Sequence, residues 1–236
     1  MTSIGSLAFS TCTSLASIHI PASVTSIGIN VFWGCSGLNY ITVESGNTKY
    51  DSRNDCNALI KTETNTLIQG YKNTVIPDDV TTIGSEAFTG CTALTSIEIP
   101  ASVTYIGGYA FQGCTSLTAV TIYAPSLPGT TVFGDNASDL KIYVFSDCVD
   151  TYKGHAPGMG ADVDDILPIE SISLKDNGDN SSLITAADGA SLAVTLQGRT
   201  LYKDGKWNTL CLPFNVTIAG SVPTSTSAPP RPASSC

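Results

Sequence analysis

The cysteines are the first residues in this chain that could do chemistry. Eight are present, and four recur at one fixed spacing within a repeated motif: Cys12, Cys35, Cys91 and Cys114. If successive motifs stack as coils, these side chains point in parallel, with Cβ atoms about 4.8 Å apart where a disulfide prefers about 3.8 Å. We therefore expect buried free thiols that fill space as small apolar groups. Pairing of Cys12 with Cys35 and of Cys91 with Cys114 is the alternative.

The two histidines lack the partners that catalysis or metal binding needs. A catalytic triad requires a nucleophile, a base within hydrogen-bond reach and an orienting acid. His19 stands among Ser and Thr, and His155 lies in a glycine-rich stretch. No two cysteines form a CxxC pair, so no spacing resembles a zinc site. The sequence predicts no catalytic residue, no metal and no cofactor.

Acidic residues gather in the stretch from Asp135 to Asp179. Calcium needs six to eight oxygen ligands from a defined loop, and neither DVDD (162–165) nor DNGDN (176–180) reproduces the EF-hand spacing. Glycoside hydrolysis needs two carboxylates at a set separation, and nothing singles out one pair. We interpret these residues as a solvated edge and a tight turn.

Composition excludes further classes of function. Acidic residues outnumber basic ones by 20 to 11 and the net charge is −9, so the chain lacks the clustered Lys and Arg that neutralise a phosphate backbone, and no nucleic-acid partner is expected. No apolar run reaches the length of a membrane span, and no signal peptide opens the chain. Because Ile4 already lies inside a repeat, we expect a piece of a longer protein.

The repeat decides what the remaining residues build. IGSEAFTGC (83–91) recurs as IGGYAFQGC (106–114), and earlier copies begin at Ile4 and Ile27. The shared pattern is IGxxAFxxCxxLxxIxIPxxVT, with a period of about 23 residues. Such periods with a short LxxIxI core are typical of leucine-rich solenoids. The fold class predicted is mainly β: a leucine-rich repeat solenoid with a parallel strand ladder, short helical turns and a small incomplete antiparallel β segment.

Each position in the repeat has a structural interpretation. In SIEIP (96–100) the isoleucines alternate with outward Ser96 and Glu98, the period of a half-buried strand, and Pro100 ends it. The glycine after the first isoleucine sits where the chain turns or approaches a neighbour. One phenylalanine per coil is expected to stack in an interior column: Phe9, Phe32, Phe88 and Phe111.

The pattern breaks at defined places, which predicts the domain organisation. Residues 1–134 form the solenoid, interrupted near 44–77, where ALIK and TLIQGY flank the polar turn TETN (62–65) as an inserted hairpin. Residues 135–168 form a terminal cap, and 169–220 an incomplete β-rich module. Residues 221–236 are a low-complexity, disordered tail, which is either a natural linker or the result of a lost reading frame after Val222.

The repeat unit resembles the BspA-like leucine-rich repeat family over roughly residues 4–168, including NTKYDSRNDCNALIKTETNTLI (47–68) and IYVFSDCVDTYK (142–153). KWNTLCLPF (206–214) resembles the opening of a β-rich module that often follows such repeats. The resemblance implies a secreted or cell-surface adhesion protein, mostly of anaerobic bacteria and some protists. It therefore implies a host or matrix protein, a glycan or another cell as partner.

The candidate contacts lie on the outward side of the strands, where curved solenoids commonly bind. We expect a monomeric, non-catalytic adhesion module. Its predicted ligand-binding residues are His19, Tyr40, Thr42, Glu98, Thr121 and Tyr123. Two other interpretations stay open: the targeting arm of a surface enzyme whose catalytic domain lies elsewhere, or a structural spacer.

Overall fold

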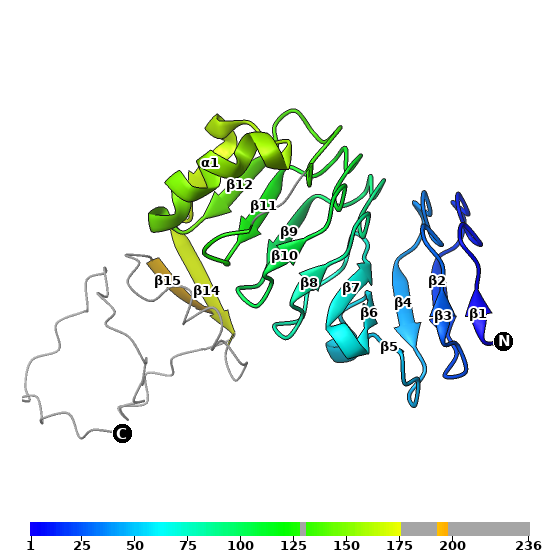
Figure 1. Cartoon of the computed structure of the whole chain (residues 1–236). Helices are drawn as coiled ribbons and strands as arrows, with labels where there is room; N and C mark the ends of the chain where they lie inside the picture. Colours follow the sequence, from blue (N-terminus) through cyan, green and yellow to red (C-terminus); the bar gives the residue numbers. More distant parts are fainter. Residues whose placement is uncertain (128–130, 176–192, 198–236) are drawn as a thin grey trace, which may run out of the picture. The chain divides into compact units, whose positions relative to one another are not determined.

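The computed structural model describes residues 1–127, 131–175 and 193–197, with side chains up to Glu170. Met1–Thr200 form one compact unit (Figure 1). Within it the chain winds as successive coils, and the coils that begin at Ile4, Ile27, Ile83 and Ile106 each contribute one two-residue strand and one four-residue strand. This is the predicted leucine-rich solenoid, and the mainly β fold class is confirmed.

We call the series formed by the longer strands of successive coils the first ladder; it consists of two sheets. Each follows the LxxIxI part of a coil, so its isoleucines or valines face the interior and its intervening residues face outward. β2 pairs with β4 in parallel, and β9, β11, β12 and β13 form a second parallel sheet (Figure 1). The strands are β2 (Ser17–Ile20), β4 (Tyr40–Val43), β9 (Ser96–Ile99), β11 (Ala119–Ile122), β12 (Lys141–Val144) and β13 (Ile166–Pro168).

The shorter strands precede the glycine of each coil. β1 pairs with β3, and β8 with β10, again in parallel. Their bounds are β1 (Ser3–Ile4), β3 (Ser26–Ile27), β8 (Thr82–Ile83) and β10 (Tyr105–Ile106). At Gly28 and Gly107 a Cβ would lie 2.3 Å from the backbone nitrogen of Ser6 or Ser85 in the preceding coil, so close coil-to-coil approach explains these glycines.

The predicted column of phenylalanines fills the interior. Phe9 stacks on Phe32 with ring centroids 5.6 Å apart, and Phe88 on Phe111 at 4.9 Å. Phe133 extends the second stack at 5.5 Å from Phe111. The column is therefore in two pieces, because the coil between Phe32 and Phe88 has no phenylalanine.

That intervening coil carries the inserted hairpin around TETN. β6 (Leu59–Lys61) and β7 (Thr66–Gln69) are antiparallel and are joined by the 3-10 turn η2 (Thr62–Thr64). A second 3-10 turn, η1 (Arg53–Asp55), lies between β5 (Tyr50–Asp51) and β6, which pair antiparallel. β7 then pairs in parallel with β8, which returns the chain to the solenoid.

After the last regular coil the chain forms a helix that the sequence did not predict. The 3-10 turn η3 (Ser146–Cys148) leads into α1 (Val149–Met159), which buries Tyr152, Ala156 and Met159, and η4 (Val163–Asp165) follows. The Phe133 N–H donates to the Met159 carbonyl, just as the Phe111 N–H donates to the Val132 carbonyl one coil earlier. The end of α1 therefore continues the hydrogen bonds that join the turns of successive coils. The helix was missed because GHAPGM holds glycine and proline, which are weak helix formers.

The segment beyond Pro168 corrects one prediction. β14 (Ser171–Lys175) pairs with β15 (Ala193–Gln197) in parallel, so the expectation of an antiparallel segment is wrong for this pair. A parallel pair needs a crossover of a dozen or more residues, and residues 176–192 supply that length. Residues 200–220, where a further strand was expected, and the tail 221–236 lie outside the described residues; the division of the chain into domains stays a prediction.

Candidate functional site

The first ladder presents a surface that we call the outward strand face: the outward-pointing residues of β2, β4, β9, β11 and β12, together with Tyr123, which follows β11. Cross-strand partners on it are neighbours in register. All six predicted contact residues lie on this face. The structure divides them into two groups of three.

The first group lies on β2 and β4. His19 and Thr42 are opposite each other, and His19 Nδ1 lies 2.9 Å from Thr42 Oγ1. Tyr40 faces Ser17 and exposes 63% of its surface, a large fraction for an aromatic residue. This half of the face offers a hydrogen-bonded imidazole and an exposed ring with no formal charge beside it in register.

The second group lies on β9 and β11. Glu98 on β9 lies opposite Thr121 on β11, and Tyr123 comes two residues after Thr121. The Tyr123 ring packs at 5.9 Å from Phe145. Burial and the nearby Glu98 carboxylate, to which it is hydrogen-bonded, raise the pKa of the Tyr123 phenol. Tyr123 therefore stays protonated and can hold the Glu98 carboxylate in place.

Two residues of this face were missed in the sequence. Lys141 and Tyr143 on β12 lie opposite Ala119 and Thr121 and continue the two outward rows. The Lys141 ammonium is paired with the Asp165 carboxylate, and this hydrogen bond raises the Lys141 pKa. Alignment of KIYV with the SIEI of β9 would have found both, because it keeps the strand pattern after the rest of the motif is lost.

The two groups do not share one continuous sheet. The exposed edge of β4 is covered by side chains of the inserted coil: Asn57 Oδ1 accepts from the Ile41 N–H at 2.9 Å, and Ser52 Oγ accepts from the Val43 N–H at 3.0 Å. Asn57 Nδ2 also donates to the Asn39 carbonyl at 2.6 Å. The Asn57 amide thus takes the place of a backbone rung, and the outward rows stop at β4.

The cysteines fit the prediction of free thiols, with one correction. All six within the described residues are unpaired; burial raises the pKa of Cys56 and Cys91 to about 11 and that of Cys114 to about 12. The Cys114 thiol donates to the Phe88 carbonyl of the preceding coil. The expectation that all four are buried is wrong for two of them, since Cys12 is exposed and Cys91 is only partly buried.

The part of the chain that the structure describes contains no cluster of side chains suited to a metal ion. Residues 1–127, 131–175 and 193–197 hold no group of three His, Cys, Asp or Glu that could bind a metal ion. His155 lies on α1 with its ring edge-on to Tyr152, and its Nδ1 is buried without a hydrogen-bond partner. In the same residues, no helix has the length and hydropathy needed to cross a bilayer.

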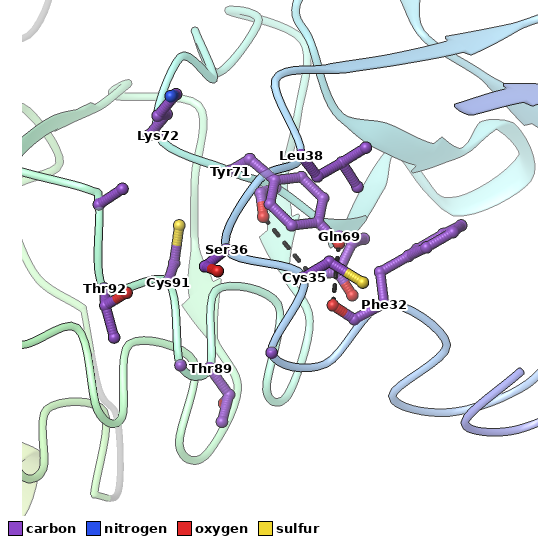
Figure 2. Close-up of a pocket in the computed structure, with 14 residues that line it drawn as sticks. Phe32, Cys35, Ser36, Leu38, Gln69, Tyr71, Lys72, Thr89, Cys91 and Thr92 are labelled. Carbon is purple, nitrogen blue, oxygen red and sulfur yellow. Dashed lines mark hydrogen bonds between the residues drawn. The ribbon is translucent and has the colours of Figure 1, made fainter. Parts of the chain in front are cut away.

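The interruption leaves cavities between the coils that flank it. Figure 2 shows the smaller one, where residues 32–38 face Thr89, Cys91 and Thr92 with Gln69 and Tyr71 between them. Its volume of about 10 Å³ has room for one water molecule. The buried Tyr71 hydroxyl donates to the Phe32 carbonyl at 3.3 Å and partly fills the space of the absent phenylalanine.

Comparison with known proteins identifies the repeat. A model of the BspA type leucine-rich repeat region matches the chain in six copies over residues 1–73 and 60–151. A leucine-rich cell surface protein from Faecalibacterium prausnitzii A2-165 is 27% identical to this chain and superposes with a TM-score of 0.50. The match covers 84% of this chain and 52% of the F. prausnitzii protein.

A leucine-rich repeat protein from Eubacterium ventriosum ATCC 27560 is 24% identical over 74% of this chain and 54% of its own, with a TM-score of 0.45. The chain therefore spans about half the length of each of these two proteins. No match was found among curated proteins.

Proposed function

Because the chain belongs to the BspA-type leucine-rich repeat family, we propose that it is a non-catalytic adhesion module carried on the outside of a bacterial cell. It binds a protein or glycan ligand, on a host cell, its matrix or another cell, through the outward strand face. The F. prausnitzii protein, which is a cell surface protein, supports the location. The module acts as a monomer.

The observation that carries this proposal is the contrast between the two sides of each strand. The inward residues of β2, β4, β9 and β11 are Ile or Val in every case, as burial in one continuous core demands. The outward residues in the same coils differ from strand to strand: one row reads His19, Thr42, Glu98, Thr121 and Tyr143. Stability requires no such variety on a solvated face, whereas recognition does.

The chemistry of the two groups indicates how they contribute. Tyr40 is the best anchor, because exposed aromatic side chains bury a large area on binding and dominate the energetics of many interfaces. Glu98, Thr121 and Tyr123 supply polar recognition from a rigid ladder, which loses little conformational entropy when it binds.

The experiment is an array of matrix proteins and bacterial and host glycans, probed with the full chain. For a ligand found there, Tyr40→Ala is expected to weaken binding by about 10-fold or more, and Glu98→Gln by about 3- to 10-fold. Tyr105→Ala is the matched control, since Tyr105 is an exposed aromatic residue on β10, outside the outward strand face; its affinity should stay within twofold.

Two results contradict the proposal. If no ligand on the array exceeds background, the chain is better described as a spacer. If a ligand binds but neither Tyr40→Ala nor Glu98→Gln weakens it, binding occurs on another surface.

A further inference from the structure

The turns of this solenoid carry a backbone ladder that the interruption leaves unfinished. In each regular coil, three alternate N–H groups of the IGxxAFxxC turn donate to carbonyls of the next coil. The first coil donates from Leu7, Phe9 and Thr11 to Ile29, Val31 and Trp33; a later coil donates from Glu86, Phe88 and Gly90 to Gly108, Ala110 and Gln112. These bonds are 2.7–3.1 Å long.

The second coil has the same donors and lacks the acceptors. Among the described residues, the N–H groups of Asn30, Phe32 and Gly34 have no hydrogen-bond partner. Across the interruption, the carbonyls of Ser85 and Thr89, which a preceding coil would fill, also have none. One wall of the interruption therefore presents free donors and the other presents free acceptors.

The inserted coil fills only the middle of this space. The Gly70 N–H and the Gln69 side chain both donate to the Ala87 carbonyl, at 2.9 and 3.1 Å. A Cβ on Gly70 would lie 2.3 Å from the Phe88 ring, so backbone alone fits there. Leu59, Ile68 and Gln69 of the inserted coil line the Asn30 side of the space, but no described residue of this coil accepts a hydrogen bond from the Asn30 N–H.

That side is a cavity of about 290 Å³, near the lower limit of roughly 300–1,000 Å³ for ligand sites. We call it the missing-coil cavity. Its apolar lining comes from Ile27, Phe32, Leu59 and Ile68. The lining also includes Asn30 and Phe32, whose N–H groups are free, and Ser85 from the other side of the interruption, whose carbonyl is free. An unpartnered N–H in a residue as buried as Phe32, which is 1% exposed, costs about 1–3 kcal/mol.

We propose that a short extended peptide segment of a partner protein adds into the missing-coil cavity as the absent rung. Its carbonyls accept from the Asn30 and Phe32 N–H groups, and its N–H donates to the Ser85 carbonyl. One apolar side chain packs on Leu59 and Ile68, and a Lys or Arg next to it pairs with Glu86, the single charged residue of the lining.

Donors on one wall and an acceptor on the other, with room for one chain between them, match a polypeptide backbone, as in other cases of strand addition. Sugar hydroxyls do not require this polarity. The cavity lies along the turns and the two-residue strands, so this binding does not depend on the ligand proposed for the outward strand face.

The test begins with the full chain and a phage-displayed library of random heptapeptides. The best sequence is synthesised with acetyl and amide ends, and its affinity is measured by calorimetry. Trp33 provides a signal near the cavity, because it directly follows Phe32 of the lining. In a Trp207→Phe background, Trp33 is the only tryptophan, and its emission should change on binding.

Peptides N-methylated at successive positions test whether the backbone makes the contacts. Loss of one hydrogen bond of this kind weakens binding by about 5- to 10-fold. The loss should be confined to one position, because only one peptide N–H donates to the Ser85 carbonyl. Equal effects at all positions would overturn the proposal.

Ser85→Trp places a large side chain at the position that supplies the proposed acceptor and should weaken binding at least about 30-fold. Ser116→Trp places the same ring on an exposed turn outside the cavity and should leave the affinity within twofold. Ile29→Ser is a second variant, which shortens an exposed residue of the lining and should weaken binding by about 3-fold. It keeps the test decisive if Ser85→Trp unfolds the chain.

Three further outcomes decide between occupants. Retention of peptide binding in Tyr40→Ala supports a site separate from the outward strand face. A library that yields no binder, or binders that Ser85→Trp and Ile29→Ser leave unchanged, overturns the proposal. A concentration-dependent dimer in sedimentation that Ser85→Trp abolishes would overturn it in favour of a second copy of this chain as occupant.

Discussion

The regular coils from Gly84 to Ile122 and the interrupted coil from Glu44 to Pro77 satisfy the backbone hydrogen-bonding groups of neighbouring coils in different ways. In the regular coils, backbone groups of one coil bond to backbone groups of the next. Where the interrupted coil meets the coil before it, side chains do much of that work: Asn57 and Ser52 cover the edge of β4, and the Tyr50 hydroxyl accepts from the Ile27 N–H at 3.0 Å. A solenoid can thus depart from its repeat wherever single side chains replace the missing rungs.

The comparison also shows where this substitution is incomplete. Asn57 and Ser52 together make three hydrogen bonds to the edge formed by β4 and the preceding Asn39. No residue does the same for Asn30 and Phe32 in the turns that the structure describes. The interruption is therefore closed along the strands and open along the turns, which explains why the missing-coil cavity occurs there.

The largest expected effect tests the packing of the regular coils. Phe111 is fully buried and stacks on both Phe88 and Phe133, so Phe111→Ala should lower the free energy of unfolding by about 3–5 kcal/mol. Phe32 is equally buried but stacks only on Phe9, and its other side borders the cavities. Urea unfolding should therefore show Phe32→Ala to be about 1 kcal/mol less destabilising; equal losses would contradict the comparison.

The next effect tests the side-chain rungs of the interrupted coil. Asn57→Ala removes both hydrogen bonds and leaves the Ile41 N–H and the Asn39 carbonyl unsatisfied. We expect a loss of about 2–3 kcal/mol in the same assay. Asn73→Ala, an exposed asparagine of the same coil, is the control and should change stability by less than about 0.5 kcal/mol. A loss at Asn57 no larger than at Asn73 would show that the rung is dispensable.

The smallest effect concerns the ion network that ties the hairpin to the next coil. Arg53 contacts the carboxylates of Asp51 and Asp79 and the Asn65 side chain. Burial raises the pKa of Asp51, but hydrogen bonds from Arg53 and Thr62 lower it by more, so its net pKa lies below the usual value. The stability gained from ionised Asp51 is then present above the unfolded pKa of about 4 and is lost as the pH falls through the lower folded value.

Unfolding at a series of pH values between 2 and 7 should accordingly show a flatter acid limb in Arg53→Met. The expected loss at pH 7 is about 1 kcal/mol, because both side chains of the Arg53–Asp51 pair are partly exposed. Lys141→Met removes the more exposed pair with Asp165 and should cost less. If Arg53→Met leaves the loss of stability at low pH unchanged, the pKa of Asp51 does not contribute to that loss.

Much of the fold could be predicted because the repeat states it many times. Isoleucines at alternate positions predict the strands. Gly28 and Gly107 mark the places where two coils approach closely, and one phenylalanine per coil predicts the stacked rings. α1 could not be predicted, because its stability comes from burying Tyr152 and Met159 against the last coil and not from its own helix propensity. The parallel pairing of β14 and β15 was missed because alternation alone is the same for either direction.

For the candidate site, sequence alignment alone assigned the six outward residues to rows, and the register of β2 with β4 and of β9 with β11 agrees with those rows. Periodicity decides which side of a strand a residue occupies, and that property is local. The tertiary structure decided the rest: the separation of the rows at Asn57, the contact between Tyr123 and Glu98, and the free donors at Asn30 and Phe32. These features depend on which segments become neighbours in space, and a pattern read within one coil contains no information about its neighbours.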